Sequence, residues 1–367
     1  MDLPVLRNFT MRKSYVIKAA TCAALAMGAA VFFLPASRAE SGAPKYEVDV
    51  TWPKPLPDRW VIGGLDGVCV DAQDHVFLLN RQDVLEGDLN AGRLAPPVIE
   101  LDSTGKLINS WGDTKLLDPR LHSCTFDKDN NMWIGSAPSG MIQKYTHDGS
   151  KLLLQIGKKG VFDSSDGTVK GHPLNSDAAV FFMPSSIFVD PKNGDIYVSD
   201  GEGTGGNRRI AVMDREGKFL RQWQPEGMKT VHCLSVANDG QVYVCNRDNA
   251  RLQVYDKMGN FKKNIEIPWT PYTPPADGKV KESGGAAVSL DLSRDANQRF
   301  MYLINQNSAL IEVMDRESGK ILASFGRAGH FPGEFDQPHG IAVDSKGNVY
   351  VAENRGRRIQ KFKLVSP

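Results

Sequence analysis

The chain has 367 residues, of which 41% are hydrophobic and 24% charged, with 35 Gly and 21 Pro. This is the composition of a turn-rich globular protein, and the length suffices for one large all-β domain or two ordinary domains. The formal net charge is only +1, from 44 basic and 43 acidic residues. Such balance provides no basic surface for nucleic acid, so we expect no nucleic-acid partner.

The N-terminal residues have the pattern of an export signal. Basic residues precede an apolar stretch at 19–34, and small residues permit cleavage before Glu40. We therefore predict a signal peptide at 1–39, with 1–10 as an upstream extension if an internal Met is the start. A retained membrane anchor is the alternative, but the apolar run is shorter than the ~20 residues that a spanning helix needs. The remaining chain, 45–367, is predicted to be one exported domain (periplasmic or secreted) without stable membrane insertion.

Four cysteines follow the predicted signal, namely Cys69, Cys124, Cys233 and Cys245. An exported chain can hold disulfides, and Cys233 would face Cys245 if their strands form a hairpin. The sequence alone does not define the pairing. We expect buried free thiols at these positions, with disulfides as the alternative.

Six segments of the chain share one pattern: an apolar strand, usually an Asp, a short polar turn and a second strand. They lie at 64–78, 120–134, 183–198, 230–244, 284–303 and 337–351. A second strand–turn–strand motif follows five of them, so each unit predicts four strands. Six such units predict an all-β fold, a six-bladed β-propeller of four-stranded antiparallel blades. The sixth unit lacks a fourth strand, which 45–53 can supply, so that the N- and C-terminal strands close the ring.

Alignment of the units places a histidine at one matched position in units two, four and six only. The six residues at this position are Asp66, His122, Ser185, His232, Ala286 and His339. First strands line the channel of a propeller, so residues from alternate blades lie about 120° apart around its axis. Three imidazoles that meet with one side open have the donor pattern of a catalytic zinc site. We predict His122, His232 and His339 as metal ligands; a purely structural role is the alternative.

A second ring of residues is expected on the same face. The residues three positions after the second strands are Arg81, Ala137, Gly201, Arg247, Gln306 and Asn354. Because each hairpin folds back, Arg81 and Arg247 should flank the histidines, where cations can bind a carboxylate or stabilise negative charge. Salt bridges at the rim are the alternative for both. Two long insertions, 157–182 and 268–285, enter the same face, and we expect them to wall a substrate cleft.

The segment "QPHGIAVDSKGNVYVAEN" resembles an NHL repeat. Together with the motifs "RLHSCTFDKDNNMWI" and "VHCLSVANDGQVYVCNRDNARLQVY", this segment carries a resemblance to the peptidyl-α-hydroxyglycine α-amidating lyase family. The resemblance covers residues 60–363. The resemblance implies a six-bladed propeller with zinc bound by the histidines named above and with Arg81 and Arg247 in the active site. It also implies cleavage of the N–Cα bond of a C-terminal α-hydroxyglycine, which yields a peptide amide and glyoxylate.

Two positions depart from the family's pattern. Glu202 occupies the place of the family's catalytic Tyr, and a carboxylate beside zinc can serve as the base. Gly340 stands where the family has an Asp that binds a structural Ca²⁺ ion, so a calcium site would lack that ligand here. The catalytic candidates are therefore Arg81, Arg247 and Glu202.

Three functions stay open. The first is a zinc-dependent lyase that acts on a hydroxyglycine-type or related hemiaminal substrate, either a peptide or a small molecule. The second is a non-catalytic exported NHL propeller that binds a protein, peptide or glycan. The third is a calcium-dependent lactonase-like hydrolase, using polar residues that end the second strands: Asn80, Asp200, Asn246, Asn305 and Glu353. Turn hydrogen bonds are the structural alternative for these five. We expect a monomer.

Overall fold

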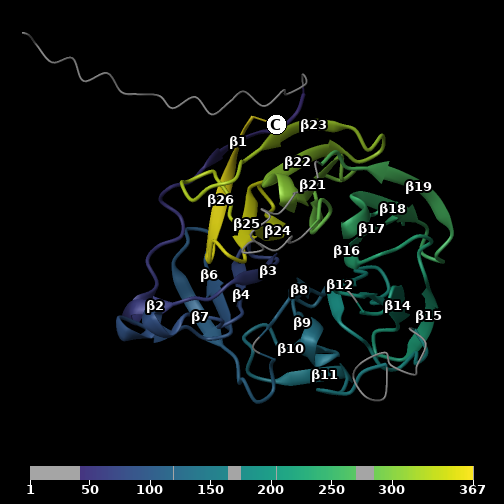
Figure 1. Cartoon of the computed structure of the whole chain (residues 1–367), viewed down its shortest axis with the longest axis horizontal. Helices are drawn as coiled ribbons and strands as arrows, with labels where there is room; N and C mark the ends of the chain where they lie inside the picture. Colours follow the sequence, from purple (N-terminus) through teal and green to yellow (C-terminus); the bar gives the residue numbers. More distant parts are fainter. Residues whose placement is uncertain (1–41, 119, 164–174, 204, 270–284, 367) are drawn as a thin grey trace, which may run out of the picture. The chain divides into compact units, whose positions relative to one another are not determined.

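The computed structural model describes residues 42–118, 120–163, 175–203, 205–269 and 285–366. These residues form six four-stranded antiparallel sheets, arranged as the blades of a β-propeller (Figure 1). The predicted fold class is confirmed. In the blades whose first strand is labelled in Figure 1, that strand lies nearest the centre of the ring and the chain then steps outward, except that the outermost strand of blade six is the N-terminal β1.

The strands of the first three blades follow the predicted units. Blade one contains β3 (Leu65–Val70), β4 (Val76–Asn80), β6 (Val98–Leu101) and β7 (Leu107–Trp111). Blade two contains β8 (Ser123–Phe126), β9 (Met132–Ser136), β10 (Met141–Tyr145) and β11 (Leu152–Gly157). Blade three contains β12 (Pro184–Val189), β13 (Ile196–Asp200), β14 (Arg209–Met213) and β15 (Phe219–Trp223).

The other three blades complete the ring. Blade four contains β16 (Val231–Val236), β17 (Val242–Asn246), β18 (Arg251–Tyr255) and β19 (Phe261–Glu266). Blade five contains β20 (Leu290–Leu292), β21 (Phe300–Asn305), β22 (Leu310–Asp315) and β23 (Ile321–Phe325). Blade six contains β24 (Pro338–Val343), β25 (Val349–Glu353), β26 (Arg358–Ser366) and β1 (Lys45–Val48).

A few short elements lie outside the blades. β2 (Trp60–Val61) and β5 (Arg93–Leu94) form a parallel pair. The described helices are short 3-10 segments at Pro57–Arg59, Glu86–Asn90, Ala137–Ser139, Arg247–Asn249 and Gln306–Ser308. None of the described helices is long and apolar enough to cross a membrane. The predicted signal peptide, 1–39, and parts of both long insertions, 164–174 and 270–284, lie outside the described residues.

The ring closes between the two ends of the propeller. β1 pairs antiparallel with β26, with Tyr46 opposite Leu364 and Val48 opposite Phe362. This is the pairing that the sixth unit's missing strand predicted. It covers the edge of β26 that would otherwise expose unpaired backbone groups.

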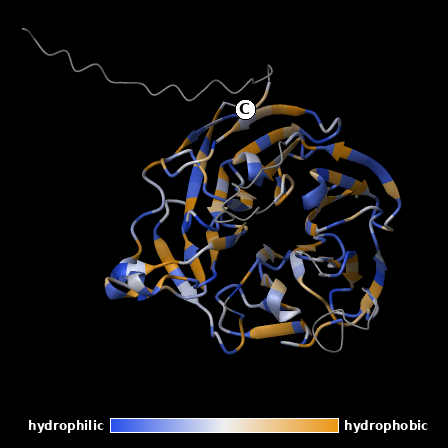
Figure 2. Ribbon diagram, viewed as in Figure 1, coloured by the Kyte–Doolittle hydropathy of each residue, from blue (hydrophilic) through white to orange (hydrophobic). Residues whose placement is uncertain are grey.

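Burial explains the hydrophobic pattern of each blade. Every residue of β4, β13 and β17 is buried, because these second strands lie between neighbouring blades and pack on both faces. In the outer strand β15, residues alternate between partly buried and exposed, since only one face meets the protein. Figure 2 shows the corresponding hydrophobic colour along inner strands and hydrophilic colour in many of the turns.

The polar residues that end the second strands fix the loops between blades. Asn80 Oδ1 accepts the backbone N–H of Gly63 at 2.9 Å, and Asp200 Oδ1 accepts that of Phe182 at 2.8 Å. The others make comparable bonds: Asn246 and Asn305 donate to loop carbonyls, and Glu353 accepts a loop N–H. These five residues therefore make the loop hydrogen bonds that were the structural alternative to a calcium-dependent site.

The expectation of free thiols is wrong. Cys69 in β3 is bonded to Cys124 in β8, with 5.8 Å between their Cα atoms. Cys233 is bonded to Cys245 within blade four, with 4.8 Å between the Cα atoms. The first disulfide joins two blades, because the ring places β3 beside β8 although the cysteines are 55 residues apart in sequence. That proximity follows from blade packing, which cysteine spacing does not show.

A buried arginine holds the connection into blade three. The side chain of Arg209 is fully buried and donates to Asp200 Oδ2 at 2.9 Å, to Gln222 Oε1 at 2.7 Å and to two loop carbonyls. Asn207 Nδ2 also donates to Asp200 Oδ2, at 2.7 Å. Burial raises the pKa of Asp200 to about 6, although Arg209 opposes that rise. The network therefore anchors both ends of the loop that carries Glu202.

Replacing Arg209 by Met should leave Asp200 as a buried carboxyl without its cation. We expect Arg209→Met to lower the free energy of unfolding by about 3–5 kcal/mol, the range for breaking one side of a buried ion pair. Equilibrium unfolding in guanidinium chloride measures this change. Arg215→Met is the control, because the Arg215–Glu216 pair is exposed and its loss should not move the midpoint. Equal midpoints for both variants would contradict the anchoring role.

Candidate functional site

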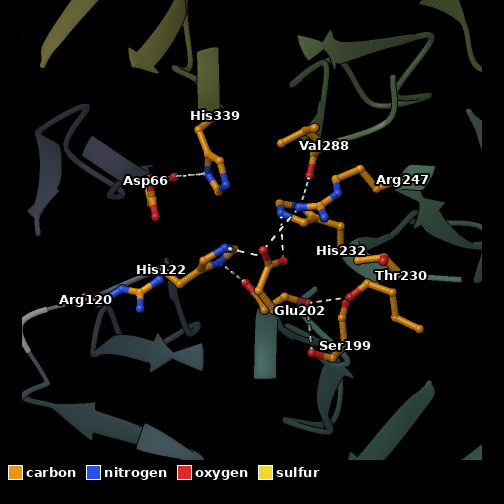
Figure 3. A network of polar contacts seen from close by, with 12 residues as sticks. Asp66, Arg120, His122, Ser199, Glu202, Thr230, His232, Arg247, Val288 and His339 are labelled. Atoms are coloured by element: carbon orange, nitrogen blue, oxygen red, sulfur yellow. Dashed lines mark hydrogen bonds and ion pairs between the residues drawn. The ribbon is translucent and has the colours of Figure 1, made fainter. Parts of the chain in front are cut away.

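The structure brings the three predicted histidines together. His122 directly precedes β8, while His232 lies in β16 and His339 in β24. Their ring centroids are 4.8–5.2 Å apart. The residues are only 8%, 2% and 8% exposed. Figure 3 shows the three rings projecting from different blades toward one central space.

A backbone carbonyl of the next blade orients each histidine. Nδ1–H of His122 donates to Ser185 O at 2.6 Å, and Nδ1–H of His232 donates to Val288 O at 2.6 Å. Nδ1–H of His339 donates to Asp66 O at 3.0 Å. Because a carbonyl can only accept, Nδ1 carries the proton, and in the neutral ring Nε2 keeps its lone pair. This is the orientation that histidine ligands of metals usually have.

The acceptor in blade five corrects the alignment of that unit. Ser293 N–H bonds to Phe300 O, which marks Ser293 as the residue that ends the first strand of the hairpin. The matched position, five residues earlier, is therefore Val288 and not Ala286. In the sequence, Asp291 resembles the Asp that ends the first strand in most other units, and this resemblance points to Ala286.

Glu202 projects into the space between the rings (Figure 3). Its Oε2 lies 2.9 Å from His232 Nε2 and 3.8 Å from His122 Nε2, and its Oε1 accepts from Arg247 at 3.2 Å. Oε2 and both Nε2 atoms are buried, yet none makes a well-oriented hydrogen bond to any described residue. Three buried polar atoms without such a partner therefore face one another.

The electrostatics of the site favour a cation among these atoms. Burial lowers the pKa of each histidine, which favours the neutral ring over imidazolium. Burial alone would raise the pKa of the Glu202 carboxyl, but the charge of His232, when that ring is protonated, and the Arg247 guanidinium outweigh burial and hold that pKa well below its usual range. A neutral Nε2 and a carboxylate oxygen are both acceptors, so their close approach costs energy unless a cation lies between them.

The donor set fits a transition metal. One ring nitrogen from each of the three histidines lies within 4.8 Å of the others, so a single ion can reach all three with small shifts. Three imidazole nitrogens suit Zn²⁺, and a carboxylate oxygen is an acceptable further donor. Glu202 is therefore placed either to complete the ligand set or to act as a base beside it.

Two cavities meet at the histidines. The larger, of about 510 Å³, is lined by the first strands and includes all three histidines. The smaller, of about 190 Å³, is lined by five of the six residues of the predicted second ring: Arg81, Ala137, Arg247, Gln306 and Asn354. At the sixth position the lining residue is Glu202 in place of its neighbour Gly201.

Both predicted arginines flank the histidines, and both are ion-paired. Arg81 contacts Asp66 Oδ2 at 2.7 Å, and Arg247 contacts Glu202 Oε1 at 3.2 Å and Asp248 Oδ1 at 3.0 Å. Each arginine side chain is 16% exposed. The geometry thus places them where the sequence predicted, while also showing the salt bridges of the structural alternative.

Sequence reasoning missed Arg120, which also lines the smaller cavity. Arg120 is exposed, and among the described residues no carboxylate forms an ion pair with it. It precedes His122 by two residues, in the loop that enters blade two. Arg120 begins the second predicted unit but lies outside both matched positions, so the repeat pattern gives no signal for it.

The structure explains why Gly340 follows the third histidine. A Cβ at Gly340 would lie 2.7 Å from Asp66 O and 3.1 Å from Val68 N. Such contacts leave no room for a side chain unless β3 moves. The Asp ligand of the family's calcium site therefore does not fit at this position.

Comparison with known proteins identifies NHL repeats at residues 230–255 and 335–362. The chain is 24% identical to peptidyl-glycine alpha-amidating monooxygenase B of Xenopus laevis, over 86% of this chain and 35% of that protein. It is 25% identical to peptidyl-alpha-hydroxyglycine alpha-amidating lyase 1 of Drosophila melanogaster, over 71% of this chain and 47% of that protein. It is 27% identical to NHL repeat-containing protein 3 of Mus musculus, over 87% of this chain and 84% of that protein.

The chain spans about a third of the length of the Xenopus relative. Among solved structures, the streptogramin B lyase structure matches with a TM-score of 0.53 and 13% identity, over 88% of this chain and 98% of that one. This likeness supports the fold alone. The repeats, the fold and the relatives together show that the chain is an NHL-repeat propeller resembling the peptidyl-α-hydroxyglycine α-amidating lyases.

Proposed function

We propose that the protein is a zinc-dependent lyase that cleaves the N–Cα bond of a C-terminal α-hydroxyglycine or a related hemiaminal. The products are an amide and glyoxylate. One observation carries the proposal: His232 Nε2 faces Glu202 Oε2 at 2.9 Å where three histidines meet, with each Nδ1 proton already donated elsewhere. The relatives that are named amidating lyases support the choice of reaction.

His122, His232 and His339 would hold the zinc ion. When bound there, zinc supplies a Lewis acid that polarises a substrate oxygen. The neutral rings and their fixed Nδ1–H bonds preorganise the three Nε2 atoms, so that little reorganisation accompanies binding.

Glu202 is placed to act as the base. Its carboxylate takes the proton of the substrate hydroxyl, and the carbonyl of glyoxylate forms as the N–Cα bond breaks. The electron pair of that bond goes to the amide nitrogen, to which Glu202 returns the proton. Arg247 holds Oε1 at 3.2 Å and favours the deprotonated carboxyl before the reaction.

Arg120 is best suited to bind the carboxylate of the substrate. Asp66 already neutralises Arg81, and Glu202 and Asp248 neutralise Arg247. Arg120 lines the same cavity without a carboxylate partner among the described residues. A guanidinium binds a carboxylate through two parallel hydrogen bonds, which would orient the α-carbon toward the histidines.

A binding propeller without catalysis is the second candidate. The match to NHL repeat-containing protein 3 of mouse covers 84% of that protein, whereas the match to the Xenopus relative covers 35% of that one. In that function the histidines would be structural and the protein would purify without zinc. The lactonase-like alternative is less favoured, because the polar residues it needs make loop hydrogen bonds.

We also propose export of the protein from the cytoplasm and a monomeric state. Two disulfides in a chain of this kind are typical of an oxidising compartment. The partner would be a peptide or small molecule that enters the smaller cavity.

Glyoxylate release tests the proposed reaction. The purified protein should convert an α-hydroxyglycine-terminated peptide into the peptide amide and glyoxylate, and a zinc chelator should abolish this activity. His232→Ala should remove the zinc bound by the three histidines and the activity, whereas His330→Ala, at an exposed histidine, should change neither. Zinc bound by the three histidines without glyoxylate release would exclude this reaction, and a zinc content that His232→Ala leaves unchanged in protein purified without chelators would exclude this metal site.

Glu202→Gln separates the two roles open to this carboxylate. If Glu202 is the base, the variant should keep its zinc and lose about 10²–10⁴-fold in kcat, the usual contribution of a general base. Zinc content by mass spectrometry and kcat are measured on the same preparation. A variant that loses zinc and regains activity in excess zinc would instead identify Glu202 as a ligand.

Arg120→Ala should weaken substrate binding. Loss of hydrogen bonds to a charged group, worth about 1.5–3 kcal/mol, predicts a KM higher by about 10–150-fold, with a smaller change in kcat. Arg120→Lys should recover part of the loss, because it keeps the charge but not the paired hydrogen bonds. Arg215→Ala, on the exposed surface, is the control. An unchanged KM for Arg120→Ala would assign the substrate carboxylate to another residue.

A further inference from the structure

A second group of metal-ligating side chains lies at the turn ends of blades one and two. Asp71 follows β3, His75 precedes β4, Glu100 lies in β6, and His147 lies in the turn between β10 and β11. Asp66, beside the three histidines, is five residues from Asp71 along an extended strand, which corresponds to roughly 17 Å. The group is therefore separate from the candidate zinc site.

The donor atoms of this group already lie close to coordination geometry. His147 Nε2 is 2.7 Å from Asp71 Oδ2, and His75 Nδ1 is 2.9 Å from Glu100 Oε1 and 3.5 Å from Asp71 Oδ2. One donor atom from each residue lies within 4.8 Å of all the others. Ligands of a tetrahedral zinc ion, with bonds of about 2.0–2.2 Å, are about 3.4 Å apart, so small shifts suffice.

Charge and burial require a cation at this place. The Asp71 side chain is fully buried and that of Glu100 is 5% exposed. Two buried carboxylates so close together are costly unless positive charge compensates them. Among the described residues, neither carboxylate forms an ion pair with a Lys or Arg; their ion-pair partners are His75 and His147.

Comparison with blade two shows what is different. Lys144 of β10 lies opposite Trp133, and its ammonium contacts the strand-ending Asp127 at 2.7 Å. In blade one the residue at the matched position, opposite Phe77, is Glu100. A carboxylate thus replaces the ammonium group that neutralises the turn aspartate in blade two. Blade six also has a lysine here, Lys361, opposite Tyr350.

The histidines also depart from the repeat. His75 follows Asp71 by four residues, a position that Asn131 and Asn348 occupy in blades two and six. In those blades the Asn side chain donates to the turn aspartate. Imidazole in place of the amide supplies a metal donor that the turn itself does not need.

Packing holds the donors in place before any ion binds. Backbone N–H groups of Gln73 and His75 occupy Asp71 Oδ1 at 2.8 and 2.7 Å, which leaves Oδ2 for the group. The His147 ring packs against Phe77 and Phe126, with centroids 5.3 and 5.7 Å away. Preorganised donors of this kind are characteristic of metal sites with four protein ligands.

We propose that Asp71, His75, Glu100 and His147 bind one divalent transition-metal ion of the Zn²⁺ class, which links blade one to blade two. Two imidazoles and two carboxylates suit Zn²⁺ better than Ca²⁺ or Mg²⁺, which prefer oxygen donors alone. The ion supplies the positive charge that Lys144 provides in blade two. Two imidazolium–carboxylate ion pairs without metal are the alternative.

Zinc binding by the full chain tests this site apart from the first. After removal of metal with a chelator, the unsubstituted chain should bind two equivalents of Zn²⁺ and the His147→Gln variant one. In the His232→Ala background one equivalent should remain, and Zn²⁺ should raise the unfolding temperature; His147→Gln added to that background should abolish both effects. His330→Gln is the control. Undiminished binding in His147→Gln, or zinc without effect in the His232→Ala background, would overturn the proposal.

Glu100→Lys provides a second variant that keeps the fold. It installs the lysine of blades two and six, so the turn aspartate gains an ammonium partner in place of the ion. We expect a folded protein whose unfolding temperature no longer responds to occupancy of this site and which binds one equivalent less of Zn²⁺. Glyoxylate release should persist in this variant and in His147→Gln, so failure of this site and of the proposed reaction are distinguishable. Full zinc stoichiometry in Glu100→Lys would contradict the ligand assignment.

Discussion

The hydrogen bond from each histidine Nδ1 to a carbonyl of the next blade determines what the centre of this propeller can do. His122, His232 and His339 all make it, at 2.6–3.0 Å. The bond fixes the tautomer and turns Nε2 toward the axis, and burial lowers the pKa of each ring, which favours its neutral form. Three buried lone pairs therefore converge beside the two cavities, and a single cation would satisfy them together.

This constraint also explains the alternation around the ring. Blades two, four and six supply imidazoles, while blades one, three and five supply the acceptors Asp66, Ser185 and Val288. A carbonyl can serve with any side chain attached, so the odd blades show no shared residue at this position. The close approach of β24 to β3 does restrict the residue after His339. Gly340 lies against the backbone at Asp66, where a Cβ would not fit.

The repeat pattern was sufficient to predict the blades, the closing strand and the meeting of the three histidines, because each depends on a period that the sequence displays. The remaining features depend on contacts between blades. The Cys69–Cys124 disulfide, the position of Arg120 and the shift from Ala286 to Val288 are of this kind. None leaves a periodic signal, since each arises where two units of different sequence meet.

The same hairpin frame places different groups beside the turn aspartate in different blades. In blade two Lys144 neutralises the turn aspartate, whereas in blade one Glu100 stands at the matched position and the imidazoles of His75 and His147 lie against the carboxylates. At the axis, Glu202 likewise adds a carboxylate to a group of neutral rings. In both places an acidic side chain replaces a neutral or basic one beside converging imidazoles. A repeat scaffold tolerates that change because the strands are held by their own ladders and core. The added charge then has to be balanced locally, and a bound metal ion would balance it with the donors already present.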